Sequence, residues 1–147
     1  MSRSFRHPIG VSLDMAPLFA LPEKLKAAQD RAIERTTNEV KELAQDFAHV
    51  ISGAMQAGTY AKTHGKSGYS EAVQAAQDKL PTVKILPEIA DQNPGEGAIS
   101  NVTEQSIFEE FGTILHEPHP FMSPAAIQGE GIFISALEDE VRKELGG

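Results

Sequence analysis

The chain contains no cysteine and no tryptophan, and only two of its 147 residues are tyrosine. The lack of cysteine excludes disulfides and thiolate metal ligands. So few aromatic rings argue against a surface on which nucleic-acid bases stack. No apolar run approaches the roughly 20 residues that cross a bilayer, and the N-terminus holds no continuous apolar segment like that of a signal peptide. We therefore expect a chain that is kept in a cytoplasm, or in a particle assembled there, without membrane contact.

Basic residues are also scarce, because 13 Lys and Arg stand against 21 Asp and Glu for a net charge of −8. This balance argues against a general nucleic-acid binder. Residues 1–66 carry nine basic and seven acidic side chains, whereas residues 67–147 carry four and fourteen. The basic part of one subunit could contact the acidic part of the next. Alternatively, the acidic surface only keeps the protein soluble.

The length and the apolar fraction of 40% fit one domain with a modest core. Residues 1–21 lack periodicity and contain Pro8 and Pro17, so we expect an extended arm there and a single domain over residues 22–147. The arm has many apolar residues. We therefore expect it to pack on its own domain or to reach a neighbouring subunit.

Apolar residues at spacings of three and four predict a long helix over residues 22–56, about 50 Å in length. Gly53 and Gly58 are expected to mark its end. Residues 58–70 are rich in Gly and Ser and predict an exposed loop. Ser70 is then expected to cap a short helix over residues 71–79.

Short segments with β-branched and aromatic residues predict strands over 82–89, 98–103 and 106–111. Serine followed by proline at Ser123-Pro124 predicts the start of a C-terminal helix. Gly129 and Gly131 weaken its middle, so one interrupted helix and two separate helices both stay open. The predicted fold class is α+β, with a long N-terminal helix and a C-terminal helix packed on a small antiparallel sheet.

The residues most able to carry chemistry are His116, Glu117 and His119, with Glu109 and Glu110 nearby. Imidazoles and carboxylates bind zinc and iron well. Prolines interrupt the histidines, and the HExxH spacing of helical zinc sites is absent. We therefore expect a structural loop here, with no catalytic or metal-binding residue. A small metal-dependent hydrolase that uses the two histidines is the alternative.

No nucleotide cofactor is predicted either. The segment Gly65-Lys66-Ser67 partly matches a phosphate-binding loop. However, six residues rather than four separate it from the preceding glycine, and it follows a helix rather than a strand. No serine lies in a GxSxG nucleophile elbow.

Residues 106–126, SIFEEFGTILHEPHPFMSPAA, resemble the signature of the tail-component (neck) family of long-tailed phages. That signature has an aromatic strand ending in E-[FY]-G-T, a short loop, and P-F-[LM]-x-P-A leading into a C-terminal helix. The matching residues here are Glu110, Phe111, Gly112, Thr113, Pro120, Phe121, Met122, Pro124 and Ala125. Gly58 and Tyr60 are similar to a G-x-Y element that follows the long first helix of the family.

The motif also predicts local structure. Gly112 is expected to let the chain turn sharply after the strand. Pro120 is expected to hold Phe121 extended and pointing into the core. Pro124 is expected to begin the helix.

The resemblance implies a structural protein of the virion at the head–tail junction, assembled in the host cytoplasm, with no catalytic residues and no cofactor. It implies a homo-oligomeric ring, expected to be a hexamer at a six-fold tail. Its implied partners are head-closure or adaptor proteins on one side and tail-terminator or tail-tube proteins on the other. DNA is expected to pass through the lumen without sequence-specific binding. From the charge asymmetry alone, we expect the acidic C-terminal half to face this lumen. The arm or the loop at 58–70 is expected to reach a neighbour.

Two further alternatives remain open besides the hydrolase. A tail terminator or a head-closure protein of the same junction fits the resemblance equally well. A helical adaptor unrelated to phages would use the apolar stripe of residues 22–56 as a docking face, and would form a dimer rather than a ring.

Overall fold

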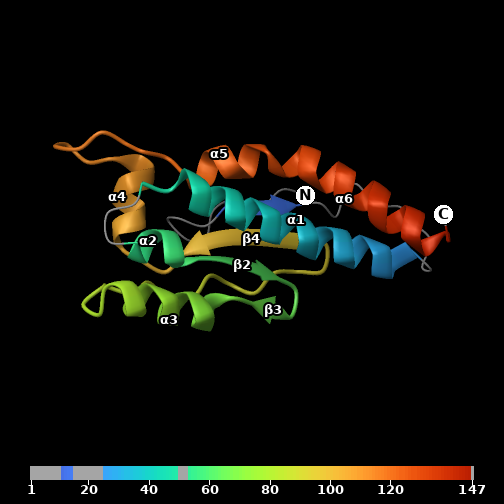
Figure 1. Cartoon of the computed structure of the whole chain (residues 1–147), viewed down its shortest axis with the longest axis horizontal. Coiled ribbons are helices and arrows are strands. Elements are labelled where there is room, and N and C mark those ends of the chain that lie inside the picture. Colours follow the sequence, from blue (N-terminus) through green and yellow to red (C-terminus); the bar gives the residue numbers. More distant parts are fainter. Residues whose placement is uncertain (1–10, 15–24, 50–52, 147) are drawn as a thin grey trace.

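A computed structural model of the chain describes residues 11–14, 25–49 and 53–146, with the backbone alone at residues 11–14. The elements are β1 (Val11–Asp14), α1 (Lys26–Phe47), α2 (Ala54–Ala57), β2 (Thr59–Thr63), β3 (Lys66–Ser67), α3 (Tyr69–Lys79), β4 (Glu96–Asn101), α4 (Gln105–Phe111), α5 (Met122–Ile127) and α6 (Gly129–Glu144). Helices around a small antiparallel sheet confirm the predicted α+β class (Figure 1). None of the helices in these ranges is long and apolar enough to span a membrane.

The sheet has four strands in the order β1-β4-β2-β3, and every pairing is antiparallel. β4 is central, and all six of its residues are buried. Ile99 pairs with Val11 of β1 on one side and with Ala61 of β2 on the other. Residues 11–14 of the expected arm therefore form an edge strand of the chain's own sheet. The rest of that arm lies outside the described residues.

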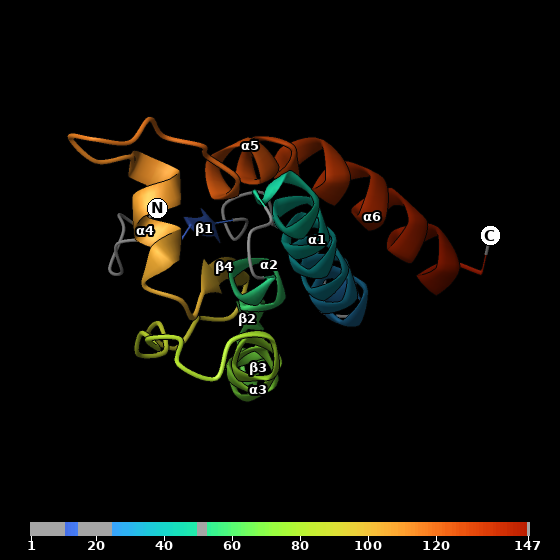
Figure 2. The ribbon, with the colours of Figure 1, turned by 60° about the vertical axis from the view of Figure 1, so that its left-hand side comes forward.

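Successive residues of a strand point to opposite faces, and the two faces of this sheet bury different layers. Ile99 faces α1 and the start of α5, while Ala98 and Tyr60 face α3 and the segment 80–89. Figure 2 shows this arrangement, with α3 on one side of the strands and α1, α5 and α6 on the other. α4 lies at one end of the sheet, next to the start of α5.

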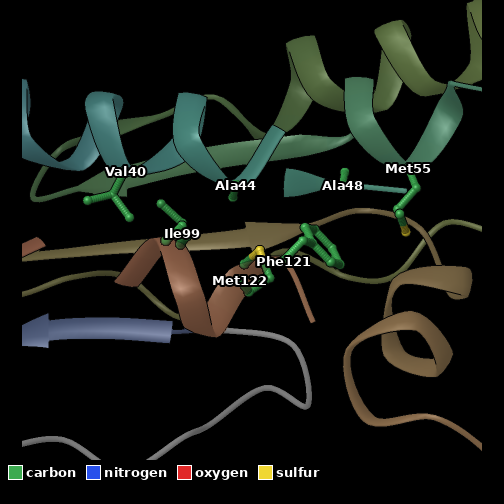
Figure 3. Packing of buried hydrophobic residues seen from close by; sticks show 8 residues of the cluster. Val40, Ala44, Ala48, Met55, Ile99, Phe121 and Met122 are labelled. Atoms are coloured by element: carbon green, nitrogen blue, oxygen red, sulfur yellow. The ribbon is translucent and has the colours of Figure 1, made fainter. Parts of the chain in front are cut away.

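The largest core cluster joins α1 to α5 across β4. Val40 and Ala44 of α1 contact Ile99 of β4, and Phe121 and Met122 fill the space beside them (Figure 3). All five side chains are fully buried. The expectation that Phe121 points into the core is confirmed. Its backbone is not extended as predicted, because its φ is −131° and its ψ is −28°.

α6 packs along α1 through a smaller apolar cluster, bordered by ion pairs. Arg31 of α1 bonds Glu140 and Glu144 of α6, with Nε–Oε1 2.7 Å and Nη2–Oε2 3.1 Å. Arg35 reaches Asp139 and Glu140 at 3.1 and 3.3 Å. Basic residues of the first half thus pair with acidic residues of the second half inside one chain.

The predicted long helix is shorter than expected. α1 ends at Phe47, and a separate turn, α2, follows Gly53, whose φ is +86°. The expected start at residues 22–24 lies outside the described residues. Residues 58–70 are not a loop, because β2 and β3 form a hairpin there. Gly58 follows the last residue of α2, and its backbone N–H donates to the Ala54 carbonyl.

Two strand predictions are wrong. Residues 82–89 contain only a single bridge, between Ile85 and Thr103, and Pro87 interrupts the segment. Residues 106–111 are helix α4, which buries Ser106, Glu109 and Glu110 on one face. A run of six residues is too short for its periodicity to separate a strand from a helix. Glu109 and Glu110 are therefore adjacent residues of a helix, and both are buried.

The helix starts also differ from the prediction. α3 begins at Tyr69, and the Tyr69 N–H donates to Ser67 Oγ at 3.2 Å, so Ser70 is not its cap. The C-terminal region forms two separate helices, α5 and α6, rather than one interrupted helix. α5 begins at Met122, so neither Ser123 nor Pro124 is its first residue.

Candidate functional site

The signature residues between positions 110 and 125 lie where α4, a loop and α5 join. Glu110 is buried on α4, with 6% of its surface exposed, and its carboxylate lies under the start of α5. Its Oε1 accepts the backbone N–H groups of Phe121 and Met122 at 3.0 and 2.9 Å. Its Oε2 accepts the N–H and the hydroxyl of Ser123 at 3.1 and 2.6 Å. Glu110 is therefore the N-terminal cap of α5, supplied from another helix.

This cap accounts for every unpaired donor at the start of α5. The first four N–H groups of a helix have no partner within the helix. At the start of α5 three of these donate to Glu110, and the fourth position is Pro124, which has no N–H. A carboxylate also interacts favourably with the positive end of the helix dipole. Pro124 lies in the first turn of α5, two positions later than the first helical position that was predicted for it.

Gly112 turns the chain out of α4, as the sequence predicts. Its φ of +74° lies in the region that favours glycine. A Cβ at this position would lie 2.8 Å from the Pro118 nitrogen and 2.9 Å from the His116 carbonyl oxygen. Both the backbone conformation and the close approach of the returning chain therefore require glycine here.

Thr113 closes a tight turn at the tip of the loop. The Thr113 N–H donates to the His116 carbonyl at 2.8 Å, and the His116 N–H returns a bond to Thr113 at 3.3 Å. The Leu115 N–H donates to Thr113 Oγ1 at 3.3 Å. At the base of the loop, the His119 N–H donates to the Glu109 carbonyl at 2.6 Å. These bonds fix the backbone of the loop at both its tip and its base.

The two residues at the tip are apolar and fully exposed. Ile114 exposes 101% and Leu115 96% of the surface of an extended residue. Phe111, at the end of α4, is also more exposed than buried. Figure 1 shows this loop projecting beyond α4 at the end of the molecule opposite to the C-terminus.

Most of the remaining signature residues belong to the core. Ala125 and Phe121 are fully buried beside α1, while Pro120 is exposed. Tyr60 is buried on β2, and its hydroxyl accepts the Ile89 N–H at 3.1 Å. Burial raises the pKa of the Tyr60 hydroxyl above its ordinary value.

Gly58 has a packing role next to Tyr60. A Cβ on Gly58 would lie 2.9 Å from Val102 Cγ2 and 3.0 Å from the Ala54 carbonyl oxygen. Gly58 and Tyr60 therefore support the sheet and do not take part in the junction of α4 and α5. The structure places the sequence-predicted residues in two groups, with Glu110 to Ala125 in one and Gly58 with Tyr60 in the other.

Sequence reasoning missed Asn101 at the end of β4, which is 1% exposed. Its Nδ2 donates to the Met55 carbonyl at 2.6 Å and to Thr59 Oγ1 at 2.8 Å. Its Oδ1 accepts the N–H and the hydroxyl of Thr103 at 2.9 and 2.7 Å. A lone asparagine after a short strand gives no sequence signal for such a role, because its partners lie up to 46 residues away.

The histidines of the loop lie near a third histidine, His49, which follows the end of α1. The ring centroids of His116 and His119 are 5.6 Å apart, and those of His119 and His49 are 5.2 Å apart. His49 Nδ1 is 3.9 Å from Oε2 of the buried Glu109. No three His, Asp or Glu side chains within residues 11–14, 25–49 and 53–146 are placed to hold one metal ion. Glu110 is already engaged in capping α5.

Comparison with known proteins gives no relative for this chain. No family model, no curated protein and no solved structure matches it.

Proposed function

We propose that this chain is a structural subunit of a phage head–tail junction. It assembles into a ring in the neck or at the top of the tail, surrounds the DNA channel and catalyses nothing. The observation that carries the proposal is the unit formed by residues 110–125. In this unit the signature residues have interlocking structural roles, in capping α5, in turning the chain and in anchoring it to the core.

The exposed tip of the loop supports a role in assembly. Two fully exposed, adjacent aliphatic residues, Ile114 and Leu115, stabilise nothing in their own chain. Exposed apolar surface of this kind, held on a fixed backbone, is typical of sites that contact another protein. A binding role also agrees with the engagement of Glu110 in hydrogen bonds to the start of α5, which gives this carboxylate a structural role.

The charge balance supports a lumen through which DNA slides. A net charge of −8 gives DNA phosphates no general attraction. Several basic side chains are moreover paired with carboxylates of the same chain, among them Arg31, Arg35, Lys62 and Lys66. We therefore propose passage of DNA without sequence-specific binding.

The helical-adaptor alternative lacks a free docking face in the described residues. It requires the apolar stripe of α1, but Ala32, Ile33 and Val40 of that stripe are buried against α6, β4 and α5. A tail terminator and a head-closure protein remain alternatives within the same junction.

The test is the native mass of the full chain, by light scattering and negative-stain imaging. It is measured alone and with the head-closure and tail-tube proteins encoded in the same genome. Six copies of a 15.9 kDa chain would weigh about 95 kDa as a closed ring. A ring, alone or with a partner, is the expected result, and the order in which partners bind identifies the layer of the junction.

A monomer under all of these conditions would contradict the proposal. So would a metal ion bound in stoichiometric amount together with hydrolytic activity, which would favour the small hydrolase that uses His116 and His119. Metal content is measured on the same purified sample.

A further inference from the structure

We propose that the loop tip of one copy docks on the outer face of α6 in a second copy of this chain. The contact seats Ile114 and Leu115 of the tip around Gly131 of the neighbour. This inference rests on the proposed function, because it names the interface through which the ring subunits contact one another.

The tip is a fixed projection. The turn between Thr113 and His116 is closed by two backbone hydrogen bonds, and the close approach of Pro118 to Gly112 holds its base. A group that is already held in its bound conformation loses little conformational entropy on binding. The apolar side chains at the tip therefore contribute most of their burial to association.

The receiving surface is a row of residues on the solvent side of α5 and α6. Ile127 and Ile134 expose 77% and 48% of their surfaces. The row continues from one helix to the next because Gln128, between them, has helical backbone angles. Gly131 lies between the two isoleucines, at the spacings of four and three that place helical residues on one face.

Gly131 leaves a shallow gap in this row. Its φ is not in the left-handed region, and a Cβ built on it would meet no atom within 4 Å. Neither the backbone nor packing within the chain therefore requires glycine at this helical position, where it disfavours the helix relative to alanine. A side chain from a neighbouring copy would fit into the gap between the two isoleucines.

The polar groups around the two surfaces are complementary. Glu130 and Glu138 are exposed on α6, four residues before and four residues after Ile134. His116 and His119 are exposed beside the tip, and an imidazole N–H donates readily to a carboxylate. The loop itself adds one carboxylate, at Glu117. An apolar pair with imidazoles would thus meet an apolar row with carboxylates.

The positions of the two surfaces determine the kind of assembly. The tip projects beyond α4 at one end of the molecule, whereas α6 runs from α5 toward the other end (Figure 1). Two different surfaces that join successive copies make a heterologous contact, which closes into a ring when the rotation allows it. A second copy is therefore the occupant that both surfaces fit.

The absence of cysteine from the chain allows a direct test by disulfide crosslinking. The double variant His116→Cys with Ser135→Cys keeps Ile114, Leu115 and Gly131 intact. Both replaced side chains are exposed, the first beside the tip and the second on α6. The matched control pairs His116→Cys with Gln74→Cys, on the exposed side of α3.

Mild oxidation is expected to give a ladder of covalent multimers from the first variant and only monomers from the control. Equal crosslinking of the two variants would overturn the proposal. Dimers from His116→Cys alone would overturn it as well, because they would indicate that two tips contact each other.

A second measurement uses the substitution Leu115→Asp. It is expected to weaken self-association at least about tenfold, because a charge would be buried in the contact. The midpoint of thermal unfolding should not change, since Leu115 packs against nothing in its own chain. Leu145→Asp, another exposed leucine beyond the end of α6, is the matched control and should leave association unchanged.

These tests separate the interface from the function. A ring that binds junction proteins but gives no crosslink between positions 116 and 135 would refute this interface and leave the proposed function standing. A crosslinked ring that binds neither head-side nor tail-side proteins would support the interface and refute the function.

Discussion

Removal of the Glu110 carboxylate is the most informative perturbation of the junction between α4 and α5. Glu110→Ala leaves the N–H groups of Phe121 and Met122 without a partner, and both of these residues are fully buried. An unsatisfied buried donor costs about 1–3 kcal/mol. The loss of a helix cap at Ser123 adds about 1 kcal/mol. Burial of the carboxylate itself opposes folding, so we expect a net loss of about 3–4 kcal/mol in the free energy of unfolding.

The assay is urea denaturation followed by circular dichroism, with hydrogen exchange of the amides at residues 121–123 as a local readout. Glu110→Gln retains one acceptor oxygen and should lose about half as much stability. Ser123→Ala removes only the 2.6 Å hydroxyl bond, and should cost about 1 kcal/mol. This mild variant keeps the test usable if Glu110→Ala does not fold.

Glu117→Gln is the matched control, because this glutamate is exposed on the loop. It should change stability by less than about 0.5 kcal/mol. If Glu110→Ala lost less than about 1 kcal/mol, or if exchange at residues 121–123 stayed as slow as in the unmodified chain, the cap would not hold α5 and the reasoning would be refuted.

Three further substitutions test other parts of the fold. Gly112→Ala should lower the free energy of unfolding by about 2–4 kcal/mol, because of the positive φ and the contact with Pro118. The control Gly131→Ala should be neutral or slightly stabilising. Equal effects of the two substitutions in urea denaturation would contradict this. Asn101→Ala leaves the buried polar groups of Met55, Thr59 and Thr103 without their hydrogen-bond partner, and should lower the free energy of unfolding by about 3–4 kcal/mol. A shift in the thermal midpoint no larger than that of a surface substitution would count against this prediction. The pKa of Glu140 is lowered, mainly by the hydrogen bond from Arg31, so its contribution to stability is present above the ordinary carboxyl range and is lost as the pH falls through the lowered value. The thermal midpoint of Glu140→Gln should therefore lie below that of the unmodified chain near pH 7, and the two should converge as the pH falls below the ordinary carboxyl range. A difference independent of pH would contradict this assignment.

The parts of the fold that the sequence predicts are those with long periodicity or strong local constraints. The spacing of Ala32, Ile33 and Val40 identifies α1, since a stripe over six turns leaves little ambiguity. Gly112 is predicted as a turn because few residues tolerate its backbone conformation. Both features depend on residues close together in the chain.

The parts that the sequence does not predict depend on partners far away in the chain. The β-branched and aromatic residues of α4 predict a strand. The buried face of α4 includes Glu109 and Glu110, however, and a pattern of polar and apolar residues does not predict that two glutamates are buried. The burial of Glu110 makes sense only with α5 in place, 11–13 residues later. In the same way, Ser123 looks like a cap from local sequence, but it donates to Glu110 as part of a cap from another helix.

The division of roles within the loop limits what its residues can do. Glu110, Gly112, Thr113 and Phe121 are each held by contacts in their own chain, so a substitution at any of them acts first through stability. The tip residues have no such contacts, and a polar replacement there would not weaken the fold. Ile114 and Leu115 can therefore contribute only through a surface outside the chain. A change in assembly without a change in stability is the result that would separate a recognition loop from a structural one.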